Sequence, residues 1–200
     1  MKITILYDNN AHLGFKSGWG FSCLVDGSQR ILFDTGDDGR KLIYNFEKAN
    51  VDPKSVNKVV LSHNHWDHVD GLEGFRKFNS KAEVIHPKAF LEPTEISPGI
   101  YSTGALGTSP KEQSLVATTE KGNIVITGCA HPGLERILQT ARSLGRICGV
   151  LGGFHGFSKF AALEGIELIA PCHCTQHTEQ IKQNFCAQFK QIQAGSIIEI

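Results

Sequence analysis

Short apolar runs alternate with amphipathic stretches along the chain, and glycine or proline stands at most of the junctions between them. Apolar runs of about four to eight residues are typical of β-strands, whereas apolar residues spaced three and four apart are typical of helices. The apolar runs predict strands at residues 3–7, 20–26, 30–34, 58–62, 83–86, 100–103, 113–119, 123–128, 146–151, 167–170 and 196–200.

The helical spacing predicts helices at residues 39–49, 70–78, 132–145, 159–164 and 175–189. Pro132 suits the first turn of its helix, and Gly145 suits the end of it. Runs of strands come first and strand–helix pairs follow, so we expect two sheets with helices outside them rather than one continuous parallel sheet. The segment 93–110 is rich in glycine, proline and serine and is predicted to be the most mobile loop.

A chain of 200 residues is long enough for one sizeable core, so we expect a single domain over residues 1–200. Twenty basic and twenty acidic side chains give a formal net charge of zero. This balance argues against nucleic acid as a partner, because proteins that bind it carry a basic excess. No apolar run reaches about 18 residues, so no membrane span is expected. The sequence leaves the oligomeric state open.

Six cysteines are spread unevenly along the chain, which is too dilute for a disulfide scaffold. The apolar stretch at residues 3–7 is too short for a signal peptide and is expected to form a strand. These features favour a reducing, cytoplasmic compartment.

Nine residues are histidines, and three of them lie in the segment SHNHWDH at residues 62–68. The side chains of ligand type there are His63, His65, Asp67 and His68. Clustered imidazoles lower one another's basicity and are costly to desolvate unless a cation replaces their protons. Neutral imidazole and carboxylate are the usual ligands of zinc, iron and manganese. We therefore predict a metal site in this segment, in preference to a chance polar loop.

Three further histidines, His131, His155 and His173, each follow an apolar strand and lie beside small residues. Ligands that are delivered from several strand ends can converge on one edge of a sandwich. We predict that His131 and His173 are metal ligands. His155 is a further candidate, with an ordinary loop histidine as the alternative.

The pattern His63-x-His65-x-Asp67-His68, preceded by LFDTG at residues 32–36 and followed by His131 and His173, resembles the metallo-β-lactamase superfamily. The resemblance runs nearly end to end. A prokaryotic branch described as metal-dependent hydrolases, which includes an archaeal dihydropterin / ribofuranosyl-aminobenzene phosphate synthase, is similar in further segments. These are LYDNN at 6–10, SGWG at 17–20, GCAHPG at 128–133, GGFH at 152–155 and APCHCT at 170–175. Such motifs are specific for fold and metal and poor for substrate.

The resemblance implies an α+β fold, a four-layer αββα sandwich with the site at one edge. It implies that a first metal is held by His63, His65 and His131. It implies that a second metal is held by Asp67, His68 and His173. Asp34 would accept hydrogen bonds that orient the histidine loop, with an Asx-type turn as the alternative.

One departure from the superfamily pattern concerns the aspartate that often bridges both metals. The acids between His131 and His173 are Glu135, Glu164 and Glu167, and none lies at the expected strand end. His155 occupies that region instead, and a neutral imidazole binds a single metal. We therefore expect a weaker second site, and hence one or two divalent ions, with zinc first and manganese or iron as alternatives. The smaller negative charge favours an anionic substrate such as a phosphate ester.

A zinc-type centre lowers the pKa of water to about 7 and polarises a substrate oxygen. Asp67 is the candidate catalytic residue, because it can orient the water or take its proton. Asn9, Asn10 and His12 are candidates for holding a substrate oxygen, with turn formation as the alternative. Trp19 is a candidate aromatic wall for a substrate ring, with edge packing as the alternative.

The cysteines near these histidines are expected to be packing residues. Cys172 and Cys174 flank His173, and alternation along an extended chain turns both of them away from a metal on His173. Cys129 is interpreted in the same way. No Cys-x-x-Cys pair occurs, which argues against an iron–sulfur cluster.

We predict a metal-dependent hydrolase that acts on an ester-type, phosphate-bearing small molecule. The first alternative is a transferase of the methanopterin-pathway type, which displaces diphosphate from a dihydropterin diphosphate. The second alternative is a non-enzymatic metal- or redox-binding module, which would have no open coordination position.

Overall fold

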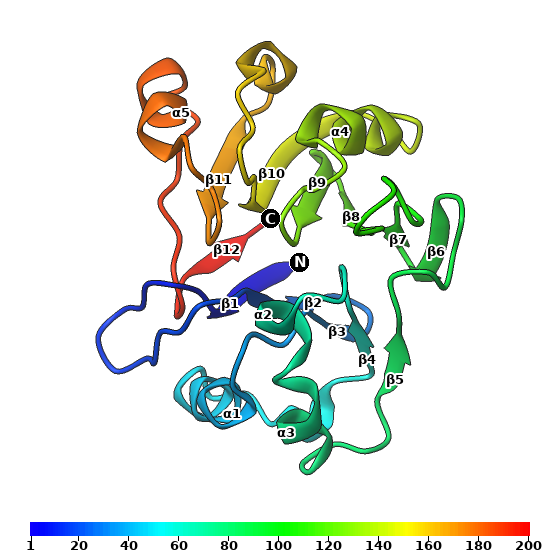
Figure 1. Cartoon of the computed structure of the whole chain (residues 1–200), viewed down its shortest axis with the longest axis vertical. Coiled ribbons are helices and arrows are strands. Elements are labelled where there is room, and N and C mark those ends of the chain that lie inside the picture. Colours follow the sequence, from blue (N-terminus) through cyan, green and yellow to red (C-terminus); the bar gives the residue numbers. More distant parts are fainter. The chain divides into compact units, whose positions relative to one another are not determined.

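A computed structural model describes residues 1–200, which divide into two compact units (Figure 1). The first unit comprises Met1–Pro87 and Gln193–Ile200, and the second comprises Lys88–Ile192. Each unit contains one six-stranded sheet, so the prediction of two separate sheets is confirmed. No helix combines the length and the apolar character that crossing a bilayer requires.

The sheet of the first unit has parallel and antiparallel parts. Its strands are, in spatial order, β12 (Ile197–Glu199), β1 (Lys2–Tyr7), β2 (Ser22–Asp26), β3 (Arg30–Phe33), β4 (Lys58–Val60) and β5 (Glu83–Ile85). Pairing from β12 to β3 is antiparallel, and β3, β4 and β5 pair in parallel. Because neighbouring parallel strands end at the same edge of a sheet, Asp34 after β3 lies near the histidine-rich turn after β4.

The helices of the first unit lie in the connections between its parallel strands. They are α1 (Gly39–Lys48), the short 3-10 helix η1 (Pro53–Ser55), α2 (Trp66–Val69) and α3 (Leu72–Arg76). The buried face of α1 carries Leu42 and Phe46, and the Phe46 ring lies 6.0 Å from that of Phe75 in α3. The two helices approach closely at Gly39, where a Cβ would lie 2.6 Å from the Cα of Gly74. Figure 1 shows α1 and α3 side by side below their sheet.

The second unit has its parallel strands at the other end of its sheet. Its strands are, in spatial order, β11 (Leu168–Cys172), β10 (Ile147–Gly153), β9 (Gly122–Thr127), β8 (Leu115–Thr119), β7 (Ile100–Ser102) and β6 (Thr94–Ser97). Only β9, β10 and β11 pair in parallel. The helix α4 (Leu134–Arg142) buries Ile137 and Leu138 against β9 and β10. The segments after the three parallel strands carry His131, His155 and His173.

Several predicted features of the second unit differ in the structure. Within segment 93–110, predicted as a mobile loop, β6 pairs with β7 through a turn at Gly99, whose φ of +73° suits a residue without a Cβ. The helix predicted to start at Pro132 begins at Leu134, because Gly133 before it has a φ of +94° and is not helical.

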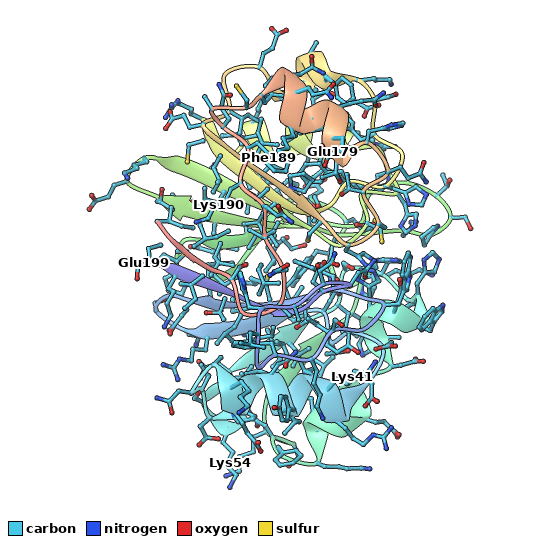
Figure 2. All side chains as sticks on the ribbon, turned by 90° about the vertical axis from the view of Figure 1, so that its left-hand side faces the viewer. Lys41, Lys54, Glu179, Phe189, Lys190 and Glu199 are labelled. Carbon is cyan, nitrogen blue, oxygen red and sulfur yellow. The ribbon has the colours of Figure 1, made fainter.

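The helix predicted at 175–189 is shorter, and α5 spans Thr178–Asn184. The chain after it leaves the helix because it pairs with the outer edge of β11. The Ile169 N–H donates to the carbonyl of Gln188, and the Lys190 N–H donates to the carbonyl of Ile169. Figure 2 shows Phe189 and Lys190 on this extended segment, away from Glu179 on the helix. The predicted helix at 159–164 is the 3-10 helix η2 (Phe160–Leu163).

Candidate metal centre

The histidine-rich turn of the first unit brings three imidazole rings together. His63 follows β4 and is buried, whereas His65 is exposed and immediately precedes α2. The centroid of the His63 ring lies 4.5 Å from that of His65 and 4.3 Å from that of His68. His68 is fully buried in α2. Three such rings in contact fit a cation better than they fit a cluster of protonated side chains.

A buried carboxylate fixes the orientation of two of these rings. Asp34 Oδ2 accepts a hydrogen bond from His68 Nδ1 at 2.7 Å and another from Ser62 Oγ at 2.7 Å. The Ser62 oxygen in turn accepts from His63 Nδ1 at 2.9 Å. Asp34 Oδ1 accepts from the Ser62 N–H at 2.7 Å. Burial raises the pKa of Asp34, and the neighbouring His68 and the hydrogen bonds from Ser62 oppose that rise.

These bonds decide which nitrogen of each ring can bind a metal. An ionised carboxylate only accepts hydrogen bonds, so the proton of His68 is on Nδ1. The Ser62 hydroxyl donates its single proton to Asp34, so it accepts from Nδ1 of His63. In neutral imidazoles of this tautomer, Nε2 is the atom that carries the ligand lone pair.

Asp67 lies in the same turn, in the first turn of α2, and is 7% exposed. Its Oδ2 is 3.8 Å from Nε2 of His68, so a carboxylate oxygen stands beside a nitrogen of ligand type. The backbone around it is tightly packed. A Cβ at Gly20, whose φ is +148°, would collide with the carbonyl oxygen of Asp67.

In the second unit, a buried glutamate holds the turn that carries His131. Glu112 is 1% exposed, and its Oε1 accepts hydrogen bonds from the backbone N–H groups of Cys129 and Ala130 at 2.9 and 2.8 Å. Its Oε2 accepts from the N–H and the Nδ1 of His131 at 3.0 and 2.8 Å. By the same argument as for His68, the ligand atom of His131 is Nε2. Glu112 is not among the site residues predicted from the sequence, because nothing in its flanking residues sets it apart from a surface acid.

His155 and His173 both have left-handed backbone conformations, with φ of +47° and +51°. Such values are uncommon for residues other than glycine, and they cluster at functional sites. Five non-glycine residues of the chain have them, and four lie at the sites described here: Asp34, Ala130, His155 and His173. His155 is exposed, and its ring centroid lies 5.1 Å from that of His131.

The backbone at His173 changes the expected place of Cys174. Because the φ of +51° at His173 breaks the extended alternation, the side chain of Cys174 does not point away from that of His173. The ligand atoms of Cys129, His173 and Cys174 all lie within 4.8 Å of one another. A hydrogen bond with Cys129 and the adjacent His173 lower the pKa of the Cys174 thiol to about 5, against an opposing effect of burial. Cys172, by contrast, ends β11 and is buried, as expected of a packing residue.

The donor set of each unit fits a divalent transition metal. The first unit offers imidazole and carboxylate, and the second offers imidazole and thiol, all ligand types that zinc accepts. The hydrogen bonds from Nδ1 atoms to buried carboxylates are also those that orient metal-binding histidines in other proteins.

The four predicted substrate residues lie on the segment that follows β1. Asn9 Oδ1 accepts a hydrogen bond from the Gly20 N–H at 3.2 Å, and Asn10 is exposed. His12 is exposed, but Nε2 lies 3.1 Å from Ser196 Oγ and Nδ1 lies 2.9 Å from Gln193 Nε2. The Trp19 side chain is 54% exposed. The structure therefore gives Asn9 and His12 a role in holding this segment in place.

Comparison with known proteins identifies relatives over most of the chain. A family model described as the metallo-beta-lactamase superfamily matches residues 20–133. The chain is 26% identical to the 7,8-dihydropterin-6-methyl-4-(beta-D-ribofuranosyl)-aminobenzene-5'-phosphate synthase of Methanocaldococcus jannaschii, over 92% of this chain and 91% of that protein. It is 30% identical to a hydroxyacylglutathione hydrolase of Ruegeria pomeroyi, over 86% of this chain and 64% of that protein.

A solved structure described as a metal-dependent hydrolase of the beta-lactamase superfamily is also similar. It has a TM-score of 0.83 and 27% sequence identity, covering 100% of this chain and 99% of that one. Together with the two sheets and their helices, this likeness confirms the predicted α+β fold class.

Proposed function

The chain belongs to the metallo-β-lactamase superfamily, and from this premise we propose that it is a metal-dependent hydrolase of an ester-type, phosphate-bearing small molecule. The observation that carries the proposal is the anchoring of His63, His68 and His131 through Nδ1, which directs Nε2 to a ligand role. A divalent metal supplies a lowered pKa for water and polarisation of a substrate oxygen.

We propose that the two units are halves of one domain, and that the two ligand sets implied by the family resemblance hold metal ions. One site would use His63, His65 and His131. The other would use Asp67, His68 and His173. The support is that a single family model runs from the first unit into the second. We keep His155 as a candidate ligand because its ring contacts that of His131.

The residues of the chain have separate tasks in this proposal. Asp34 and Glu112 hold histidine rings in one tautomer, so that no reorientation is needed when a metal binds. Asp67 takes a proton from the attacking water. Its carboxylate is suited to this task because the side chain is nearly buried. We propose zinc as the first metal, with manganese or iron as alternatives, and a cytoplasmic location in which the six free cysteines stay reduced.

The second candidate function is a transferase that displaces diphosphate from a dihydropterin diphosphate. It is favoured by the similarity to the archaeal synthase, whose name describes a phosphate-bearing pterin product. The alignment with that enzyme spans 267 positions, more than the length of this chain, so the synthase contains segments that this chain lacks. This difference is our reason for placing the hydrolase first.

The test compares both reactions on the same metal-loaded protein. We expect turnover of bis(4-nitrophenyl) phosphate or a thioester with zinc, manganese or iron, and loss of that turnover in His63→Ala and His131→Ala. His86→Ala is the control, because His86 is exposed and outside the proposed ligand sets. Diphosphate release from dihydropterin diphosphate without hydrolysis would favour the transferase. Silence in both assays would contradict both enzyme proposals.

A further inference from the structure

We propose that Cys129 and Cys174 are sulfur ligands of the metal centre, and that with His173 they give the second unit a ligand set of nitrogen and sulfur. The proposal rests on the proposed function in one respect, since both require His173 to be a metal ligand. Its direct basis is that the Sγ atoms of both cysteines and a ring nitrogen of His173 lie within 4.8 Å of one another. Three donors at that spacing can bind one ion at metal–ligand distances of about 2.0–2.3 Å.

The ends of two parallel strands bring these sulfur atoms together. Cys129 follows β9, and Cys174 follows β11 beyond the left-handed His173. Hydrogen bonds from the N–H groups of Cys129 and Ala130 to the Glu112 carboxylate fix the first of these turns. The turn at His173 directs Cys174 back toward the first, so that its Sγ lies 3.9 Å from the carbonyl oxygen of Cys129.

A glycine between the two turns leaves room for the sulfur. Gly153, at the end of β10, would carry a Cβ 2.7 Å from Cys174 Sγ and 3.3 Å from the Cα of Cys129. Its φ is not in the left-handed region, so backbone strain does not account for a glycine here. Close approach of the two turns accounts for it instead.

The other cysteines of the chain show what packing alone looks like. Cys23 is fully buried in β2, and burial raises the pKa of its thiol well above the usual value. Cys148 in β10 is also buried, and burial again raises the pKa of its thiol. Neither belongs to a group of donors that could hold a metal. Cys129 and Cys174 differ from both because each has a sulfur and an imidazole as neighbours.

The inference changes the charge expected at the centre. The superfamily's bridging aspartate is absent from the segment between His131 and His173. Two thiolates would supply negative charge in the same unit. The second ion would then be held more tightly than we expect from the absence of the bridging aspartate alone. Thiolate ligands also favour zinc over manganese.

Cobalt substitution of the full-length protein tests the proposal, because Co²⁺ reports its ligands by absorption. Thiolate ligands produce a charge-transfer band in the near ultraviolet, which nitrogen and oxygen ligands do not. We expect this band in the reduced, Co²⁺-loaded protein, a weaker band in Cys129→Ser and in Cys174→Ser, and its loss in the double variant. Cys172→Ser and Cys186→Ser are matched controls and keep the full band.

Two results would overturn the inference, and they separate it from the proposed function. Cobalt that is bound, as shown by equilibrium dialysis and visible d–d bands, without a charge-transfer band would leave the hydrolase proposal standing and exclude sulfur ligands. No bound cobalt at all would refute both. Circular dichroism of each variant checks that it is folded, and Cys174→Ser is the safer variant because its side chain is only partly buried.

Discussion

Glu112 and His131 are nineteen positions apart in the sequence and are joined by a hydrogen bond of 2.8 Å between a carboxylate oxygen and Nδ1. Asp34 and His68 have the same relationship in the first unit, at 2.7 Å. In both cases the acid is buried and also accepts backbone N–H groups close to the histidine. Each unit therefore orients a candidate ligand with a carboxylate that is already committed to the local fold.

Replacing Glu112 by glutamine is expected to weaken metal binding about 10- to 100-fold, the usual cost of removing a carboxylate behind a metal-binding histidine. Both carboxylate oxygens of Glu112 now accept backbone N–H groups. In glutamine an NH₂ group would replace one of these oxygens and would face N–H donors. Competition with a chromophoric chelator measures the change. Glu135→Gln, a half-buried acid in α4, is the control and should bind metal normally. Unchanged affinity in Glu112→Gln would refute the positioning role.

Replacing Asp34 by asparagine is expected to destabilise the metal-free protein by about 1–3 kcal/mol, because the amide NH₂ would face a buried hydrogen-bond donor and leave it unpaired. The side chain loses a charge that now accepts from His68 Nδ1 and Ser62 Oγ. Urea unfolding of the metal-free variant measures the change in the free energy of unfolding. Asp52→Asn, an exposed residue before η1, serves as the control. An unchanged unfolding curve would mean that Asp34 does not hold the turn.

Gly153→Ala is expected to destabilise the protein by about 1–3 kcal/mol, as is usual when atoms are added to a packed region. The new methyl group would collide with the carbonyl oxygen of Gly128 and press on Cys174 Sγ. Gly156→Ala is the matched control, since its Cβ would have nothing closer than 3.5 Å. Thermal unfolding compares the two variants. Equal melting temperatures would argue against the close approach of the two turns.

Removal of metal by a chelator is expected to abolish activity and lower the melting temperature. A ligand that binds only the folded state stabilises it by about 2.7 kcal/mol when its concentration is 100 times its Kd. Returning zinc in steps should therefore raise the melting temperature with concentration.

His155→Ala tests the candidate ligand that has the least structural support. If His155 is a ligand, metal analysis of this variant should show a smaller metal content. Two tightly held ions in that variant would remove His155 from the ligand set.

The N-terminal end of α1 makes a contribution to stability that depends on pH. Hydrogen bonds from Arg40 lower the pKa of Asp38, which caps the helix. A lowered pKa in the folded state means that the contribution is present above the unfolded-state pKa and is lost as the pH falls through the folded-state value. Asp38→Asn keeps the cap without the titration, so its stability should vary less between pH 5 and about pH 3. Because the Arg40 side chain is almost fully exposed, solvent screens its interaction with Asp38 and the difference is small.

The sequence predicts the strand-rich organisation and indicates candidate metal-binding residue types, because both depend on local patterns. The alternation of apolar runs locates β1, β3 and β9 to within a residue or two at either end. The spacing of His63, His65 and Asp67 marks the candidate metal-binding turn without any knowledge of the fold. These features need no information about distant parts of the chain.

The features that the sequence does not predict depend on distant contacts or on single backbone angles. Glu112 meets His131 only because β8 and β9 pair, and its own neighbours carry no signal. Cys174 was expected to turn away, and the left-handed His173 reverses that expectation. The helix before Phe185 ends early because the chain after it pairs with Ile169. Propensity alone cannot foresee any of these.

The edge strand β12 pairs with β1, with Lys2 opposite Glu199, although the rest of the first unit ends at Pro87. During synthesis, the ribosome must therefore produce the whole second unit before the first can complete its sheet. Until then, β1 exposes an unpaired edge that can recruit strands from other nascent chains. Truncation before residue 193 should accordingly yield a product that depends on chaperones and aggregates, even though every proposed metal ligand is present.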